Sequence, residues 1–295
     1  MSIAHLPERG VLRITGSEAR ALLDRLVTND LDIVGPETAG FGALLTPQGK
    51  IIADFLIVAL PEEDGGGFLL DTSVGTLADL IKKLTLYRLR ADVQIVDLTE
   101  EAAVVAAADG GLIAPETGVV YADPRHPALG DRAVVDRADL AGLVSAPAED
   151  YHLRRITLGV PDAGKDFGFG EAFPHEAMMD QLGGVSFSKG CYVGQEVVSR
   201  MEHRGTARTR IVPVSFTDGV RPEPGVEARA GEKTIGRIGT TIRARGMAML
   251  RLDRVADAMA AGETLTGGGL PFVIERPDFI RFPMPGDADF GKADA

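Results

Sequence analysis

The chain has a single cysteine, Cys191, among its 295 residues. One thiol cannot form a disulfide within the chain, and it cannot supply the several ligands of a self-contained zinc or iron–sulfur site. The fold must therefore be stabilised by buried apolar side chains, and a 45% hydrophobic composition is sufficient for a sizeable core. The length predicts two or three domains.

The cysteine lies in the run Lys-Gly-Cys-Tyr-Val-Gly-Gln-Glu at residues 189–196. Gly190 and Gly194 give room for a ligand or another chain segment to approach the backbone closely. The apolar spacing from Val193 onward predicts a helix, which places Cys191 near its N-terminus. There the helix dipole and Lys189 favour a thiolate. The alternative is a small, buried and inert side chain, as free cysteines often are.

A second feature is Asp54, which interrupts the apolar segment at residues 51–57. By alternation it shares one face of a strand with Ile52 and Leu56. A carboxylate there either faces a cavity or is solvated at a sheet edge, and the pattern alone favours neither.

Up to about residue 206, strand and helix patterns alternate loosely and are joined by hairpins, which favours an α+β fold over a doubly wound sheet. We expect strands at 11–14, 41–45, 51–60, 68–70, 93–96 and 104–106, helices at 19–27, 74–84, 149–158 and about 176–180, a turn at 46–49 and a loop at 62–67. Ser17 is expected to cap the first helix.

After residue 208 the character changes to short strands separated by Gly/Pro turns, at 211–216, 226–229, 234–239, 248–252 and 272–274. This pattern is typical of a small all-β domain. The last residues, from about 284 to 295, have the composition of a disordered tail.

The net charge of −12 and the pI near 4.9 argue against direct binding to nucleic acid. Residues 1–8 contain neither a basic region nor an apolar stretch typical of a signal peptide, and no apolar run is long enough to span a membrane. We therefore expect a soluble, cytoplasmic monomer that does not bind membranes.

Four segments carry a resemblance to a known family. They are residues 183–197 (Gly-Gly-Val-Ser-Phe-Ser-Lys-Gly-Cys-Tyr-Val-Gly-Gln-Glu-Val, followed by Arg200), residues 155–161, residues 26–30 and residues 49–54. Together they resemble the YgfZ-type folate-binding proteins, which are relatives of the T-protein, the aminomethyltransferase of the glycine cleavage system. The resemblance extends from about residue 10 to about residue 282.

The resemblance implies an α+β, aminomethyltransferase (GcvT)-like folate-binding fold. Two interleaved α+β subdomains would occupy residues 1–206, a C-terminal β-barrel residues 207–283 and a disordered tail residues 284–295. The implied function is to bind tetrahydrofolate, or a one-carbon-substituted folate, and to support assembly or repair of iron–sulfur clusters in client enzymes, including tRNA-modifying ones. Implied partners are folate and iron–sulfur client proteins or assembly factors.

The resemblance also implies a site. Asp54 corresponds to the aspartate that acts on the reacting folate amine in the aminomethyltransferases, and Cys191 would be the reactive thiol. The implied cofactor-binding residues are Asp54, Thr157, Lys189, Gly190, Tyr192, Gly194, Gln195, Glu196 and Arg200. No metal site is implied. The spacing of Glu196 and Arg200 also permits an ordinary surface ion pair.

Two departures from the aminomethyltransferases are visible. Thr157 stands where those enzymes have a pterin-binding glutamate, and a hydroxyl cannot make the same paired carboxylate contact. The cysteine run replaces a cysteine-free pattern. The alternative function, a folate-dependent aminomethyltransferase that moves a one-carbon unit between an amine and tetrahydrofolate, is supported by Asp54 and opposed by both departures. Whether the chain is an enzyme stays open at this point.

Overall fold

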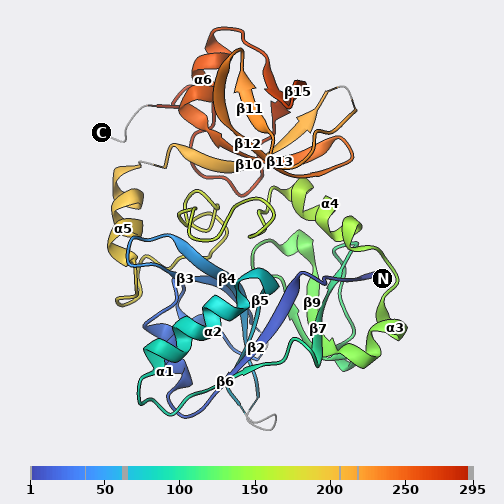
Figure 1. Cartoon of the computed structure of the whole chain (residues 1–295), viewed down its shortest axis with the longest axis vertical. Helices are drawn as coiled ribbons and strands as arrows, with labels where there is room; N and C mark the ends of the chain where they lie inside the picture. Colours follow the sequence, from blue (N-terminus) through green and yellow to red (C-terminus); the bar gives the residue numbers. More distant parts are fainter. Residues whose placement is uncertain (1, 37, 62–65, 206, 218, 292–295) are drawn as a thin grey trace.

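The computed structural model describes residues 2–36, 38–61, 66–205, 207–217 and 219–291. Two sheets with their helices form the N-terminal part, and a β-barrel forms the C-terminal part (Figure 1). The irregular segment that precedes α5 lies between the barrel and the N-terminal sheets in the same view. The expected α+β fold with a C-terminal barrel is confirmed.

The first sheet is antiparallel, with strand order β3-β4-β5-β2-β6. Its strands are β2 (Arg9–Thr15), β3 (Gly40–Leu45), β4 (Ile51–Ala59), β5 (Phe68–Ser73) and β6 (Gln94–Asp97), and its helical elements are α1 (Ala19–Asp24), η1 (Leu31–Ile33) and α2 (Val74–Arg88). The cap of α1 is Glu18 rather than Ser17, whose hydroxyl instead donates to Asp92. Residues 62–65 of the expected loop lie outside the described part.

Alternation gives this sheet two different buried faces. On one face Leu12, Phe55 and Leu70 form a core with Leu77 and Leu80 of α2, which are both buried. On the other face, Val11 and Leu56 belong to a second, larger core that also contains barrel residues. Asp54 lies on this second face, so the packing of the other domains encloses it.

The second sheet has the order β1-β7-β9-β8 and is also antiparallel. It comprises β1 (Ile3–His5), β7 (Ala102–Ala107), β8 (Val119–Ala122) and β9 (Asp131–Asp136), with the helical elements η3 (Pro115–Thr117), η4 (Pro127–Leu129), η5 (Arg137–Asp139), α3 (Leu140–Leu143) and α4 (Ala148–Leu158). Because β1 precedes β2 in sequence but pairs with β7, the two sheets are interleaved.

Residues 160–194 contain turns but no regular helix or strand. The helix expected near residues 176–180 is therefore wrong. Met178 has φ of 63° there, a left-handed conformation that interrupts a right-handed helix. Helix α5 (Gln195–Arg204) follows this segment.

The barrel is closed in the order β10-β13-β12-β11-β14-β15, with β15 paired back to β10. Its elements are β10 (Thr209–Phe216), β11 (Glu227–Ala230), β12 (Lys233–Ile242), β13 (Arg245–Arg251), β14 (Leu265–Gly267), β15 (Leu270–Ile274) and the helix α6 (Leu252–Ala260). Helix α6, which buries Leu252, Val255 and Ala258, was not among the expected elements.

Part of the tail expected to be disordered is packed against the molecule. Met284 is buried, Phe290 contacts the core, and Asp287 pairs with Arg276. Residues 292–295 lie outside the described part, and the domain division between residues 206 and 207 stays a prediction. No helix in the described ranges has the length and apolar character needed to cross a bilayer.

Candidate functional site

Asp54 lies in the middle of β4, opposite Ala43 of β3. Its side chain is buried, and its Oδ1 has no hydrogen-bond partner among the described residues. Burial raises the pKa of Asp54 to about 6, an effect that Arg9 opposes and Asp162 reinforces. A buried, unpartnered carboxyl oxygen is costly for folding, which suggests that it serves a ligand.

Arg9 and Asp71 form an ion pair on the same face of the sheet as Asp54. Arg9 Nε donates to Asp71 Oδ1 at 2.6 Å, and its terminal nitrogen donates to the Asp71 carbonyl at 2.6 Å. From the second sheet, Arg132 approaches Asp71 Oδ2 at 2.5 Å, and the Tyr121 hydroxyl donates to the same oxygen at 2.9 Å. Asp71 thus joins the two sheets.

A second buried ion pair, Asp123 and Arg125, lies in the connection between β8 and β9 of the second sheet. Arg125 donates to both carboxylate oxygens of Asp123 at 2.9 and 2.6 Å. The Tyr151 hydroxyl of α4 accepts from Arg125 at 2.8 Å and from Arg132 at 2.7 Å. These contacts fix α4 against the sheet.

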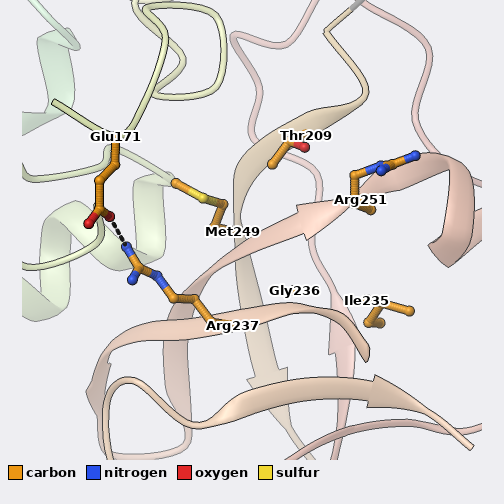
Figure 2. Close-up of a pocket in the computed structure, with 7 residues that line it drawn as sticks. All are labelled: Glu171, Thr209, Ile235, Gly236, Arg237, Met249 and Arg251. Carbon is orange, nitrogen blue, oxygen red and sulfur yellow. Dashed lines mark ion pairs between the residues drawn. The ribbon is translucent and has the colours of Figure 1, made fainter. Parts of the chain in front are cut away.

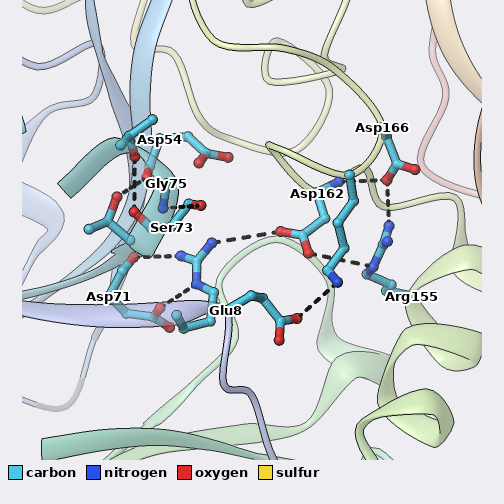
Figure 3. Close-up of polar contacts among 12 residues, drawn as sticks. Glu8, Asp54, Asp71, Ser73, Gly75, Arg155, Asp162 and Asp166 are labelled. Atoms are coloured by element: carbon cyan, nitrogen blue, oxygen red, sulfur yellow. Dashed lines mark hydrogen bonds and ion pairs between the residues drawn. The ribbon is translucent and has the colours of Figure 1, made fainter. Parts of the chain in front are cut away.

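Arg155 of α4 extends the network to the barrel. It donates to Asp166 Oδ2 at 2.6 Å and to the Thr240 hydroxyl of β12 at 2.8 Å. Asp162 lies between Arg9, at 3.6 Å, and Arg155, at 3.9 Å. Figure 3 shows Asp71, Asp162 and Asp166 along this chain of contacts, from the first sheet to the segment below the barrel.

The buried charges of this network do not balance if every group is ionised. Its arginines are Arg9, Arg125, Arg132 and Arg155, and its aspartates are Asp54, Asp71, Asp123, Asp162 and Asp166, all of them buried. Neutral Asp54 leaves equal numbers of positive and negative charges, which agrees with the direction of its pKa shift. The raised pKa of Asp54 thus matches the excess of acidic groups in this network.

Glu8 and His152 lie at the edge of the network. His152 Nε2 is 2.6 Å from Glu8 Oε1, and Arg155 Nε donates to His152 Nδ1 at 3.0 Å. Burial alone would raise the pKa of Glu8, but the contact with His152 outweighs it and lowers the pKa to about 2. This carboxylate is thus firmly ionised, in contrast to Asp54.

Cys191 is free and exposed, so the alternative of a buried, inert thiol is wrong. It also does not lie at a helix N-terminus: α5 begins at Gln195 with Gly194 as its N-cap. The two extra residues between the expected and observed helix starts separate the thiol from the first-turn amides that would favour a thiolate.

The Lys189 side chain is buried, and its amino group is bonded to the segment around the end of α1. Its Nζ donates to the carbonyls of Asp24, Val27 and Asn29 at 2.7, 3.2 and 2.7 Å, and to Asp24 Oδ1 at 3.0 Å. This lysine therefore fixes the cysteine loop to the segment that follows α1.

The two glycines of the run differ. A Cβ on Gly194 would lie 2.6 Å from the Thr46 carbonyl oxygen, and Gly194 has φ of 84°, so this position requires glycine. A Cβ on Gly190 would meet nothing within 4 Å. The close approach of the Thr46 carbonyl therefore explains why residue 194 is glycine, whereas no such contact explains the glycine at residue 190.

Tyr192 is buried between these glycines, and its hydroxyl has no partner among the described residues. Burial raises its pKa to about 12. Like the Oδ1 of Asp54, this hydroxyl is an unsatisfied buried polar group. The hydroxyl of a ligand-binding tyrosine would have this property before the ligand binds.

The remaining residues implied by the family resemblance lie nearer the surface. Glu196 and Arg200 form an exposed ion pair at 2.6 Å, and Gln195 Nε2 reaches the Gly190 carbonyl at 3.4 Å. Thr157 is exposed on α4, where its hydroxyl donates to the Leu153 carbonyl at 2.8 Å. Their role in binding stays a prediction.

The arginines around Asp54 were not predicted from the sequence. A signal for one neighbour, the aspartate Asp71, was available, because it directly follows the apolar residues 68–70. The arginines Arg9, Arg125 and Arg132 gave no comparable signal, because their partners are close in space but most are distant in sequence.

Two cavities are described near the barrel and the second sheet, and neither is lined by Asp54 or Cys191. The first, of about 340 Å³, lies on the outside of the barrel, where Arg237 pairs with Glu171 at 3.6 Å (Figure 2). The Arg251 side chain at its other end is paired with Asp253. Both arginines are neutralised, so this cavity offers little for an anionic ligand.

Comparisons with known proteins agree with this architecture. A family model described as GCVT N-terminal domain matches residues 4–108, and one described as CAF17, C-terminal beta-barrel domain, matches residues 208–282. The crystal structure of glycine cleavage system aminomethyltransferase T from Bartonella henselae superposes with a TM-score of 0.70 over 95% of this chain and 86% of that one, at 13% identity. This likeness shows the fold.

Sequence relatives are more specific. The iron-sulfur cluster assembly factor IBA57, mitochondrial, of Homo sapiens is 30% identical over 85% of this chain and 77% of its own length. The mouse protein of the same name is 31% identical over 89% and 78%. The homologue from Mycosarcoma maydis is 35% identical over 75% of this chain, which spans only 59% of that relative's length.

These relatives correct two expectations. All three are named as mitochondrial proteins, so the expectation of a cytoplasmic protein is wrong. They carry the name IBA57 rather than that of the YgfZ-type proteins, whereas the broader relationship to the aminomethyltransferases is confirmed. The chain belongs to the IBA57 family, with an aminomethyltransferase-like N-terminal part and a CAF17-type C-terminal barrel.

Proposed function

We propose that this chain supports the assembly or repair of iron–sulfur clusters in client proteins. The observation on which the proposal depends is the exposed thiol of Cys191, on a loop fixed by buried Lys189 on one side and by Gly194 on the other. The names of the relatives, iron-sulfur cluster assembly factors, support the same role.

Cys191 would act together with thiolates of another protein. An iron–sulfur cluster is commonly held by four cysteine thiolates, and this chain has one cysteine. The thiol therefore ligates a cluster only where a client or an assembly factor supplies the remaining ligands. A fixed, exposed loop suits this task, because little conformational entropy is lost when the partner docks.

We further propose that tetrahydrofolate, or a one-carbon-substituted form, binds beside Asp54. Two buried polar atoms, Asp54 Oδ1 and the Tyr192 hydroxyl, lack partners among the described residues, as ligand-binding groups do before a ligand binds. A one-carbon-substituted tetrahydrofolate would supply a one-carbon unit from its nitrogens, and unsubstituted tetrahydrofolate would accept one. Asp54, with its pKa near 6, would accept a hydrogen bond from a folate amine when ionised and donate one when protonated.

The clients proposed from the family resemblance include tRNA-modifying enzymes. With a net charge of −12, this chain is unsuited to hold RNA itself. Its contribution would then be made through contact with the client enzyme, as a monomer.

The alternative, an aminomethyltransferase, is favoured by one observation. A carboxyl group with a pKa near 6 exchanges its proton close to neutral pH, as a general acid or base requires. Turnover of an aminomethylated amine with tetrahydrofolate, lost in Asp54→Asn, would establish this activity. The absence of turnover, together with folate binding, would leave the assembly role.

The folate site is tested by calorimetric titration with tetrahydrofolate and 5-formyltetrahydrofolate. We expect wild type to bind and Asp54→Ala to lose at least tenfold in affinity. Asp79→Ala, an exposed aspartate on α2, is the matched control and should bind as wild type does. Equal binding by Asp54→Ala would remove the ligand from this site.

The role of the thiol is tested by measuring the activity of an iron–sulfur client enzyme in cells that produce the variant. Cys191→Ser should abolish the support of client activity while preserving folding and folate affinity. Ser188→Ala, an exposed position on the same loop, is the control. Full client activity with Cys191→Ser would refute the role of the thiol.

A further inference from the structure

A cavity of about 620 Å³ lies beside the second sheet, and neither Asp54 nor Cys191 lines it. Pro36, which precedes β3, contributes to the lining, and the rest comes from the connection between β7 and β8, strand β8 and the first residue of β9. The lining residues are Pro36, Leu112, Ile113, Ala114, Pro115, Val120, Tyr121, Ala122 and Asp131. Its volume is in the range of small-molecule sites, and its walls are mainly apolar, as in such sites.

Asp131, the first residue of β9, is the charged group of this lining. It is 9% exposed, and its Oδ2 accepts a hydrogen bond from the Ile113 amide at 2.8 Å. No ion pair or hydrogen bond reaches its Oδ1 from the residues that the structure describes. This carboxylate therefore has one oxygen free to accept a hydrogen bond from a ligand in the cavity.

The other buried aspartates differ from Asp131 in their partners. Asp71, Asp123, Asp162 and Asp166 each have an arginine within 4 Å. In the described part of the chain, Asp54 and Asp131 are the buried aspartates that lack one. Asp54 is assigned to the folate site, whereas Asp131 has no role in that proposal.

We propose that this cavity binds an organic ammonium ion with an apolar chain, its positive charge on Asp131 and its chain against the proline, leucine and valine side chains. The cation would supply the missing counter-charge, and its chain would cover apolar surface. Tyr121 contributes its ring to the wall, because its hydroxyl is already bonded to Asp71. Cations are attracted to such rings.

An alkylammonium group occurs both in free amines and in the lysine side chains of other proteins. The test therefore uses n-hexylammonium for the first source and the peptide acetyl-Leu-Lys-Leu-amide for the second. 1-Hexanol, which has the same chain without the charge, and hexanoate, which has the opposite charge, are the reference compounds. Binding is measured by calorimetry and by chemical-shift changes of amides at residues 111–122.

We expect n-hexylammonium to bind at least tenfold more tightly than 1-hexanol, and hexanoate not to bind. Asp131→Asn retains an oxygen for the Ile113 amide and should lose at least tenfold in ammonium affinity. Asp136→Asn, an exposed position on the same strand, should bind as wild type does. Ala114→Phe, which fills the cavity and leaves Asp131 in place, should also abolish binding.

The outcomes are distinct. Tighter binding of the peptide than of n-hexylammonium identifies a lysine of a partner protein as the occupant, and the reverse identifies a small amine. No ammonium binding by wild type, or equal binding by wild type and Asp131→Asn, overturns the proposal. Neither the cavity nor the test involves folate or Cys191, so failure of the proposed function would leave this inference standing.

Discussion

At the scale of the residue, Asp54 makes stability depend on pH in a defined direction. Its pKa is raised from 3.8 to about 6 in the folded protein. Between these values the unfolded chain releases the proton while the folded chain retains it, so stability falls as pH rises through this window. A shift of this size corresponds to about 2–3 kcal/mol at neutral pH, because each unit is worth about 1.4 kcal/mol.

Asp54→Asn should remove the loss of stability that wild type shows as pH rises. The free energy of unfolding of the variant minus that of wild type should be about 2–3 kcal/mol larger at pH 7.5 than at pH 4. Urea unfolding of both proteins at the two pH values measures the difference. A pH-independent difference between them would mean that Asp54 ionises normally in the folded state.

Leu89 is a second residue that lowers stability locally, through its backbone conformation. It has φ of 50° and ψ of −105° at the end of α2, and it is 82% exposed. The Ala91 amide bonds to the Arg88 carbonyl, so Leu89 occupies the first central position of a type II′ turn, which favours glycine. Its side chain gains little packing in return for this strain.

Leu89→Gly should therefore stabilise the protein by about 0.5–1 kcal/mol and raise its Tm by about 1–3 °C. Leu86→Gly, at an exposed position inside α2, should destabilise it by about 1 kcal/mol, because glycine is a poor helix former. Thermal unfolding followed by circular dichroism checks both. A lower Tm for Leu89→Gly would show that the turn conformation is not strained.

At the scale of the element, the cysteine loop depends on Lys189. In Lys189→Met, the carbonyls of Asp24, Val27 and Asn29 lose their common donor. Each unpaired buried acceptor costs up to about 3 kcal/mol. Because this cost falls on the contacts that fix the loop, the loop should open locally before the whole protein unfolds.

Hydrogen exchange at residues 186–194 should be at least tenfold faster in Lys189→Met than in wild type. Lys82→Met, which changes an exposed lysine on α2, should leave this exchange unchanged. If the loop exchanges at the wild-type rate in both variants, its position is determined by Gly194 and Tyr192 instead.

Elements with a clear periodicity could be predicted from the sequence. The hairpin of β3 and β4, helix α2 and the barrel strands follow from alternation, apolar spacing and turn residues. The helix near residue 178 was wrongly predicted, because apolar residues there pack in turns that a left-handed Met178 interrupts. Helix α6 was missed, since its apolar spacing continues directly from a strand.

At the scale of the whole molecule, Arg155 joins the N-terminal domains to the barrel. It is fully buried and bonded to Asp166 and Thr240. Arg155→Met should cost about 3–5 kcal/mol, because it leaves buried Asp166 without its cation. Calorimetric unfolding should then separate into two transitions, with the barrel unfolding independently.

Arg245→Met is the matched control, since Arg245 pairs with Glu275 within the barrel and both are partly exposed. It should cost less than about 1 kcal/mol and leave a single transition. A single transition in Arg155→Met as well would mean that the apolar interface alone couples the parts.

The domain order could be predicted from the sequence, but the charged network between the domains could not. Asp54 and Cys191 were noticed because each is unusual in its local context. Arg9, Arg132 and Arg155 look like ordinary surface residues in sequence, and their burial depends on partners contributed by other elements. The same applies to Asp131, whose isolation is apparent only beside the paired aspartates.

The contact of Gly194 with the turn of the β3–β4 hairpin has a consequence for how this family varies. A Cβ on Gly194 would lie 2.6 Å from the Thr46 oxygen, and one on Gly49 would lie 3.0 Å from Val197. The hairpin turn and the chain around Gly194 and Val197 are therefore in close contact. Among relatives, the lengths of the hairpin turn and of the cysteine loop should therefore change together or not at all, so that the strand with Asp54 and the loop with Cys191 are inherited as one unit.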